Sequence, residues 1–185
     1  WRDYFNNDNE IVLQLACGRG EYTTGLAEIF PKKNFVGVDI KGARLWKGST
    51  YAIENALNNA AFLRTHILNL SHFFEIKEVS EIWIPFPDPR SRKRDIKRRL
   101  TSPGFLDIYR NITKPGCLIH LKTDDKGLFE YTLSVLEQLK IKDIVSTYDL
   151  YNSDMLNDHH GIKTKYEEDY LAEGLKICCL RFRFL

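Results

Sequence analysis

The segment Leu13-Gln-Leu-Ala-Cys-Gly-Arg-Gly-Glu21 decides the fold, because an apolar strand runs here into a glycine turn and then into a helix. Glycines at positions 18 and 20 permit a tight turn and let a nucleotide-sized ligand approach the backbone beside a helix N-terminus. Asp39 ends the next apolar run, nineteen residues after Gly20, where a carboxylate can accept hydrogen bonds from ribose hydroxyls. The spacing predicts a nucleotide-type cofactor site at Gly18, Gly20 and Asp39.

Short apolar runs alternate with amphipathic segments along the chain. Buried strands are predicted at Ile11–Leu15, Asn34–Asp39, Ala61–Arg64, Glu81–Pro85 and Cys117–Leu121. Helices are predicted at Tyr22–Phe30, Ala43–Asn59, Pro103–Ile112 and Lys126–Lys140. This alternation favours right-handed crossovers and a doubly wound, mostly parallel α/β sheet that is covered by helices on both faces.

The last third of the chain departs from this alternation. Ile144–Tyr148 and Ile177–Phe184 have strand composition, and no helix follows the second, so we expect an antiparallel hairpin at the sheet edge. The polar stretch between them, Leu150–Gly174, is expected to be long and partly irregular. His159 and His160 lie in it, and we interpret them as solvent-exposed because no further metal ligand stands at a recognisable spacing. Four aromatic residues are expected in the core: Trp46, Trp83, Phe182 and Phe184.

Length and composition indicate an ordinary globular protein. The chain has 185 residues, 43% of them hydrophobic, and a net charge of +2, so we expect a single domain spanning residues 1–185. No apolar run approaches the roughly 18 residues of a membrane span. The four cysteines show no zinc or disulfide spacing, which is typical of a reduced, cytoplasmic protein. The first residue is Trp1 rather than methionine, so we expect a longer natural chain with a further N-terminal segment.

Positive charge is concentrated in one segment. Between Arg90 and Arg99 stand seven basic residues and one acidic residue, which leaves 20 basic against 24 acidic residues elsewhere. Such a cluster is typical of phosphate binding, although a solvated charged loop has the same composition.

Asp88 directly precedes the run, between two prolines at the carboxyl end of the fourth predicted strand, where ligands of α/β sheets bind. A simple surface turn is the alternative for this Pro-Asp-Pro tripeptide. The combination suggests chemistry on a nucleic-acid base.

A dinucleotide fingerprint would place a third glycine three residues after Gly20, and Thr23 stands there instead. This disfavours a nicotinamide cofactor and favours one without a pyrophosphate, such as S-adenosylmethionine.

Three motifs resemble the bacterial tRNA (guanine-N7-)-methyltransferases, in order and over nearly the whole chain. They are Pro87-Asp-Pro-Arg-Ser-Arg-Lys-Arg-Asp-Ile-Lys-Arg-Arg-Leu100, Leu118-Ile-His-Leu-Lys-Thr-Asp-Asp-Lys-Gly-Leu-Phe-Glu-Tyr131 and Thr164-Lys-Tyr-Glu-Glu168. The resemblance implies a Rossmann-like sheet of seven strands with an antiparallel C-terminal strand. It also implies methyl transfer from S-adenosylmethionine to N7 of a guanine in the tRNA variable loop.

The resemblance assigns roles to matching positions. Cofactor binding falls on Gln14, Gly18, Gly20, Asp39 and Ile67, and catalysis on Asp88. Contact with tRNA falls on Arg92, Asp124, Thr164, Lys165, Tyr166 and Glu167. Without the resemblance, Asp124 would be interpreted as a helix N-cap and Thr164–Glu167 as a loop.

The chain departs from the family pattern at three positions. Gln14 replaces the usual carboxylate at the end of the first strand, Ile67 replaces an acid in the adenine-contact segment, and Arg90 replaces an aromatic residue. These departures keep open a methyltransferase-like protein that only binds RNA, and the glycine turn keeps open a nicotinamide-dependent oxidoreductase. We expect tRNA as the partner, no metal, no membrane association, and either a monomer or a homodimer.

Overall fold

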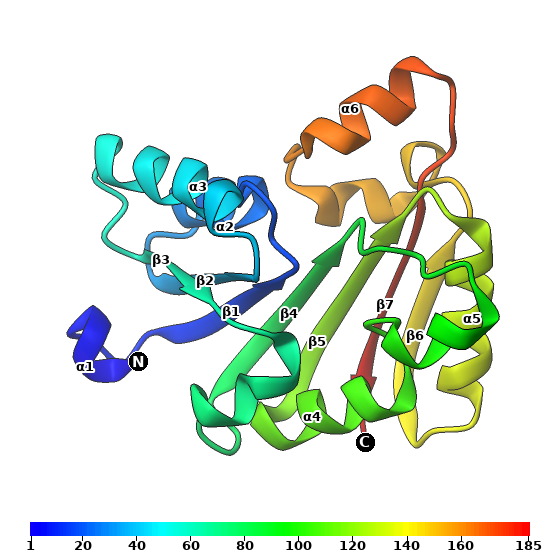
Figure 1. Cartoon of the computed structure of the whole chain (residues 1–185), viewed down its shortest axis with the longest axis horizontal. Coiled ribbons are helices and arrows are strands. Elements are labelled where there is room, and N and C mark those ends of the chain that lie inside the picture. Colours follow the sequence, from blue (N-terminus) through cyan, green and yellow to red (C-terminus); the bar gives the residue numbers. More distant parts are fainter.

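The computed structural model describes residues 1–185, and a seven-stranded sheet runs through its centre (Figure 1). The strands are β1 (Glu10–Leu15), β2 (Lys33–Asp39), β3 (Ala60–Arg64), β4 (Val79–Pro85), β5 (Thr113–Thr123), β6 (Ile141–Thr147) and β7 (Cys178–Phe184). The helices are α1 (Arg2–Phe5), α2 (Glu21–Ile29), α3 (Gly42–Glu54), α4 (Pro103–Ile112), α5 (Lys126–Glu137) and α6 (Lys165–Ala172). Short 3-10 helices are η1 (Ile67–His72), η2 (Lys93–Arg98), η3 (Leu150–Asn152) and η4 (Asp154–His159).

The strand order is β3-β2-β1-β4-β5-β7-β6, with the first five strands parallel and β7 antiparallel to both of its neighbours. The predicted doubly wound sheet and its antiparallel ending are therefore confirmed. The chain winds outward from β1 to β3 and then returns to place β4 on the other side of β1. Ligands of such sheets bind at this switch point, beyond the carboxyl ends of β1 and β4.

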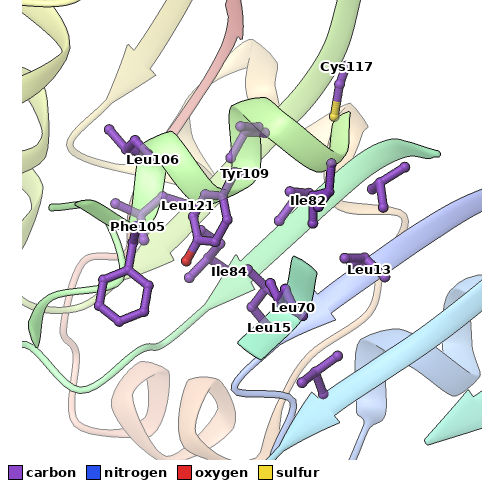
Figure 2. Packing of buried hydrophobic residues seen from close by; sticks show 14 of the residues in the cluster. Leu13, Leu15, Leu70, Ile82, Ile84, Phe105, Leu106, Tyr109, Cys117 and Leu121 are labelled. Carbon is purple, nitrogen blue, oxygen red and sulfur yellow. The ribbon is translucent and has the colours of Figure 1, made fainter. Parts of the chain in front are cut away.

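The main core lies where α4 packs on the sheet, as Figure 2 shows. Helix α4 begins at the predicted Pro103 and presents Phe105, Leu106 and Tyr109 to the strands, spaced as a helix face requires. These side chains meet strand residues such as Ile84, and all of them are buried. Burial at roughly 25 cal/mol per Å² of apolar surface is the main force that holds this layer in place.

Several details differ from the sequence-based expectations. Helix α3 ends at Glu54 rather than Asn59. The region 150–174, which was expected to be long and partly irregular, contains η3, η4 and α6. The prediction that Trp46 lies in the core is wrong, because 65% of its surface is exposed. The physical reason is that α3 buries a different stripe, made of small and apolar residues: Leu45, Gly48 and Ala52. Trp83, Phe182 and Phe184 are buried as expected. None of the helices is both long and apolar enough to cross a membrane.

Glu81 is a largely buried carboxylate that predicts how stability responds to acid. Its Oε1 accepts a hydrogen bond from Trp83 Nε1 at 2.8 Å and lies 3.2 Å from His120 Nε2, while Lys33 Nζ is 3.3 Å from Oε2. Burial alone would raise the pKa of Glu81, but His120, Lys33 and Trp83 outweigh burial and lower the pKa to about 2.

Stability is expected to fall when the pH drops from about 4.5 toward 2. A carboxyl whose pKa is lower in the folded state stabilises the fold above its unfolded pKa, and this contribution disappears as the group is protonated. The shift from 4.5 to about 2 corresponds to about 3 kcal/mol. Urea unfolding at pH 6, 4 and 2.5 checks this, with Glu81→Gln as the matched variant. An equally steep acid loss in that variant would contradict the assignment.

Candidate functional site

Two adjoining cavities open beyond the carboxyl ends of β1, β2 and β4. The larger, of about 570 Å³, lies between α3 and α6, and the smaller, of about 210 Å³, lies beside η1. Figure 1 shows α3 and α6 at the same end of the sheet, from opposite halves of the chain. Both cavities are lined by Ala16, Asp39, Ile40, Asp88 and Arg90. They therefore form one continuous cleft, at the place where doubly wound sheets bind ligands.

Asp39 closes the cleft floor at the end of β2. Its Oδ2 accepts a hydrogen bond from the Gly18 N–H at 2.9 Å, and its Oδ1 accepts one from the Lys41 N–H at 2.9 Å. A carboxylate has about four acceptor positions, so each oxygen keeps capacity for a ligand hydroxyl. Gly18 has a φ of +58°, and a Cβ there would meet no heavy atom within 4 Å. This arrangement leaves the backbone of the glycine turn accessible from the cleft.

Gln14 ties the end of β1 to the first turn of α2. Its Oε1 accepts hydrogen bonds from the Thr23 N–H at 2.8 Å and the Thr23 hydroxyl at 2.6 Å. Thr23 stands where a dinucleotide-binding turn has its third glycine, and the space that it needs comes from Gly37 on β2. A Cβ on Gly37 would lie 2.7 Å from the Thr23 hydroxyl oxygen. The close helix–sheet approach is thus achieved through a glycine on the strand.

Gly20 does not face the cleft but packs below it. A Cβ on Gly20 would lie 2.4 Å from the Phe62 ring, and a Cβ on Gly48 would lie 2.6 Å from the same ring and 2.5 Å from the carbonyl oxygen of Arg19. Gly48 on α3 therefore lets the helix approach the glycine turn. A glycine in the middle of an otherwise amphipathic helix was the available sequence signal for this contact.

Gly48→Ala is expected to destabilise the fold by about 2 kcal/mol, because the added methyl group pushes against backbone that cannot move freely. Gly104→Ala is the matched control, since Gly104 also lies in a helix and a Cβ there meets nothing within 4 Å. That variant is expected to change stability by less than about 0.5 kcal/mol, because Gly104 lies in the first turn of α4 rather than in the helix interior. Denaturant unfolding of both variants measures the difference, and equal effects in the two would refute the packing argument.

Asp88 stands at the boundary of the two cavities. It follows Phe86, whose φ of +51° turns the chain at the end of β4 and whose N–H donates to the carbonyl of Lys122 at 2.8 Å. Asp88 Oδ1 accepts from the Arg90 N–H at 3.0 Å, and Oδ2 lies 3.3 Å from Arg90 Nε. The Asp88 side chain is 62% exposed. The contacts with Arg90 therefore hold the Asp88 carboxylate in one orientation, and its exposure leaves it accessible to a ligand.

The basic run does not act as one uniform surface. Arg92, Lys93, Arg94 and Lys97 are exposed. Arg99, in contrast, is buried, donates from Nε to the carbonyl of Pro89 at 2.9 Å, and lies 4.5 Å from the Tyr131 ring centroid. Its role is to hold the loop that carries Asp88. Arg98 is exposed but pairs with Asp95 at 3.2 Å.

The motif that begins at Thr164 forms the start of α6. The Thr164 hydroxyl caps the helix by accepting from the Glu167 N–H at 3.2 Å, and Thr164, Lys165 and Tyr166 line the larger cavity. Glu167 does not reach that surface, because it is completely buried. The resemblance assigned a tRNA contact to Glu167. Because its side chain is buried, we assign it a structural role instead.

Glu167 is the centre of a buried polar network. Its Oε1 accepts from Lys122 Nζ at 2.5 Å and from the Tyr151 hydroxyl at 2.9 Å, and it lies 3.1 Å from His159 Nε2. Lys122 also donates to the Tyr22 hydroxyl at 2.6 Å. The expectation that His159 is solvent-exposed is wrong, since it is buried in this network. The network joins α6 to β5 and α2.

Opposite charges keep this network ionised. Burial alone would raise the pKa of Glu167, but the hydrogen bond from His159 and the charge of Lys122 outweigh it and lower the pKa. Burial lowers the pKa of Lys122 to about 8, against the opposing influence of Glu167. The only sequence signal was a lysine directly after an apolar strand, which does not reveal its partner.

The remaining candidate residues lie around the cleft. Ile67 lines the smaller cavity at the start of η1, and Arg92 is exposed beside the cleft but lines neither cavity. Asp124 is half-buried after β5, and burial raises its pKa. The N-cap of α5 is Asp125, which accepts from the Leu128 N–H at 2.6 Å, so Asp124 is not a capping residue. No group of three or more His, Cys, Asp or Glu side chains is arranged to hold a metal ion.

Comparison with known sequences decides the family. The family model described as "Putative methyltransferase" matches residues 8–180. The tRNA (guanine-N(7)-)-methyltransferase of Cytophaga hutchinsonii is 52% identical over 187 residues, covering 100% of this chain and 85% of the relative. The chain belongs to the tRNA (guanine-N(7)-)-methyltransferase family. Family members of the same name from Bacteroides thetaiotaomicron and Listeria monocytogenes serotype 4b are 47% and 35% identical, covering 98% and 100% of this chain and 71% and 85% of theirs.

Solved structures agree with the family on the fold. The 16S rRNA methyltransferase KamB aligns over 99% of this chain and 91% of its own with a TM-score of 0.71 and 14% identity. An rRNA methylase from Streptococcus thermophilus aligns over 100% and 93% with a TM-score of 0.62 and 12% identity. The seven-stranded sheet of this tRNA (guanine-N(7)-)-methyltransferase family member is thus the methyltransferase fold that the sequence motifs predicted.

Proposed function

We propose that this chain transfers a methyl group from S-adenosylmethionine to N7 of a guanine in the variable loop of tRNA. The observation that carries the proposal is the position of Asp88. Its carboxylate stands where the two cavities meet, within a chain of the tRNA (guanine-N(7)-)-methyltransferase family and beside an exposed basic surface. The same substrate implies a cytoplasmic location, which the four free, buried cysteines support.

The cleft fits a nucleoside-type cofactor. Asp39 keeps acceptor capacity for two ribose hydroxyls at the junction of the cavities. The smaller cavity, lined by apolar side chains that include Ile67 and Leu68, suits a purine ring. Gln14 is occupied by Thr23, so we assign it to shaping the turn rather than to neutralising the cofactor's ammonium group. When bound, the cofactor supplies an electrophilic methyl group on a sulfonium sulfur.

The reaction requires alignment more than proton transfer. Guanine N7 carries an unprotonated lone pair at neutral pH, so the N–C bond forms as the C–S bond breaks and no general base is needed. The positive charge passes from sulfur to the purine ring. Asp88 stabilises that charge electrostatically and, with two lone pairs still free after its contacts to Arg90, orients the base by accepting from guanine N–H groups.

The surface around the cleft fits a polyanionic substrate. Exposed cations of the basic run, Arg92 among them, contact the tRNA backbone and make binding sensitive to salt. Thr164, Lys165 and Tyr166 form the rim nearest the target base, and the half-exposed Tyr166 ring offers a stacking face. Asp124 adds a half-buried acceptor after β5.

The test uses methyl-labelled S-adenosylmethionine and two tRNA transcripts, one with the variable-loop guanine and one with adenine at that position. Label incorporation only into the guanine transcript, followed by chain scission at 7-methylguanine, is the expected result. Equal labelling of both transcripts would overturn the assigned base. Binding of tRNA without transfer to either, together with no calorimetric binding of S-adenosylmethionine, would support an RNA-binding protein that has lost its cofactor.

A further inference from the structure

One wall of the larger cavity carries unpaired positive charge that the cofactor and the basic run leave unexplained. Arg19 in the glycine turn and Lys41, Arg44 and Lys47 at the start of α3 all line this cavity. Arg19, Lys41 and Lys47 are exposed and Arg44 is half-buried. None of the four side chains lies within 4.0 Å of a carboxylate or donates a hydrogen bond. We call these four residues the α3 wall.

The cation on the opposite side of the cavity, Lys165, is paired with carboxylates. Lys165 of α6 lies 2.8 Å from Asp169 and 3.7 Å from Glu168 on its own helix. Its charge is therefore already compensated, while that of the α3 wall is not. Unpaired cations that face a cavity raise the local concentration of anions.

Arg44 of the α3 wall faces Tyr166 of α6 across the cavity. The Arg44 guanidinium carbon lies 6.0 Å from the centroid of the Tyr166 ring, and that ring is 49% exposed. Guanidinium planes and aromatic faces are both surfaces on which unstacked RNA bases stack. The α3 wall is thus continuous with a stacking surface at the start of α6.

The position of Asp88 relates the α3 wall to the basic run. Asp88 lines both cavities, Arg98 of the basic run lines only the smaller one, and the α3 wall lines the larger one. The α3 wall therefore stands on one side of the proposed catalytic carboxylate. On the other side lies the basic run, in which Arg92, Lys93 and Lys97 are exposed and have no ion pair. A nucleotide held at Asp88 has a phosphate on each side, and a polyanion that crosses the site meets both surfaces.

We propose that the α3 wall is a second RNA-binding surface, which holds phosphates of the substrate strand on the side of Asp88 opposite the basic run. The inference rests on the proposed function and extends it. Four cations exceed what the one carboxylate of an amino-acid-type cofactor requires, and their spread from Arg19 to Lys47 matches an extended anion. Charge complementarity with the sugar–phosphate backbone selects RNA as the occupant.

The experiment compares two double charge reversals in the full chain. Arg44→Glu with Lys47→Glu changes the α3 wall. Lys140→Glu with Lys142→Glu is the control, because both lysines are exposed, have no ion pair, and flank the start of β6 at the far end of the sheet. Affinity for tRNA is measured from 50 to 300 mM salt, affinity for S-adenosylhomocysteine by calorimetry, and KM and kcat by methyl transfer.

The α3-wall variant is expected to bind tRNA at least tenfold more weakly, to raise KM more than it lowers kcat, and to reduce the slope of log affinity against log salt by about 1.5, since each phosphate contact contributes roughly 0.7–0.9. Affinity for S-adenosylhomocysteine should change less than twofold. Arg44→Gln with Lys47→Gln, which is neutral and helix-compatible, should give an intermediate loss if the reversal misfolds.

Three outcomes would overturn the inference: tRNA affinity equal to that of the control variant, weakened S-adenosylhomocysteine binding with unchanged tRNA binding, or no tRNA binding by the unaltered chain. The second outcome would assign the cations to the cofactor carboxylate. Failure of the proposed function has a different signature. If the unaltered chain binds tRNA through the α3 wall but methylates no guanine, the RNA-binding role of the α3 wall is supported and the proposed reaction is contradicted.

Discussion

Replacing Asp88 with asparagine is expected to lower kcat for tRNA methylation by roughly 100- to 1,000-fold, the usual effect of losing one electrostatic contact to a transition state. The amide has nearly the same shape and can still accept from the Arg90 N–H, which is 3.0 Å from Oδ1. The change therefore removes the negative charge and leaves the loop in place. Affinity for S-adenosylhomocysteine should change little, because Asp39 and the smaller cavity hold the nucleoside.

Asp107→Asn is the matched control for this prediction. Asp107 is 67% exposed, close to the 62% of Asp88, and also has one arginine partner, Arg110 at 3.8 Å. It lies on α4 and lines neither cavity, so its loss should leave kcat within twofold. Single-turnover methyl transfer separates the chemical step from product release. More than a tenth of the original rate in Asp88→Asn would rule out a catalytic charge at this position.

Replacing Lys122 with methionine is expected to cost about 3–5 kcal/mol of unfolding free energy, because it leaves the Glu167 carboxylate buried without its cation. Both partners are nearly inaccessible, at 1% and 0% exposure, and their atoms are 2.5 Å apart. For a chain of this size the loss corresponds to roughly 10 °C in Tm. Glu167 holds α6 in place, and the start of α6 lines the larger cavity. The change should therefore also displace this side of the cavity, and methylation should fall together with stability.

Two further variants test whether burial of the ion pair causes the large loss of unfolding free energy in Lys122→Met. Lys165→Met removes a pair of similar length, 2.8 Å to Asp169, but both side chains are more than half exposed, so it should cost less than about 1 kcal/mol. The double variant Lys122→Met with Glu167→Met should recover much of the loss, because no unpaired charge remains. Thermal and urea unfolding measure all three. A loss in Lys165→Met equal to that in Lys122→Met would contradict the prediction.

Local patterns in the sequence were sufficient for most of the framework. Strands that are buried on both faces read as continuous apolar runs, so β1 to β5 were placed within a few residues. Pro103 marked the start of α4 because proline suits the first turn of a helix. The glycine turn and the acid at Asp39 lie on adjacent parallel strands whose carboxyl ends meet, so their meeting followed from topology alone.

Side-chain partners were not predictable in this way. Trp46 looked apolar enough for the core, but α3 can approach the sheet closely only through small residues such as Gly48, which turns Trp46 outward. Glu167 stood in a recognised motif beside residues that face the cavity, yet helix geometry points it inward to Lys122. Four neighbouring residues on a helix point in different directions. Which of them faces solvent depends on which side of the helix packs against the other helices and strands.

The amino-acid sequence by itself determined the doubly wound sheet, its antiparallel ending, the glycine turn with Asp39, and the motifs of the methyltransferase family. The first three features depend on periodicity, turn chemistry and spacing, whereas the motifs depend on a resemblance to known sequences. All four are properties of short segments. Only the tertiary structure decided that Asp88 stands between two cavities, that Glu167 and His159 are buried, and that the α3 wall faces α6. These features join segments that are distant in the chain, such as Lys122 with Glu167 and Arg44 with Tyr166. Burial and charge pairing exist only after folding has brought such segments together.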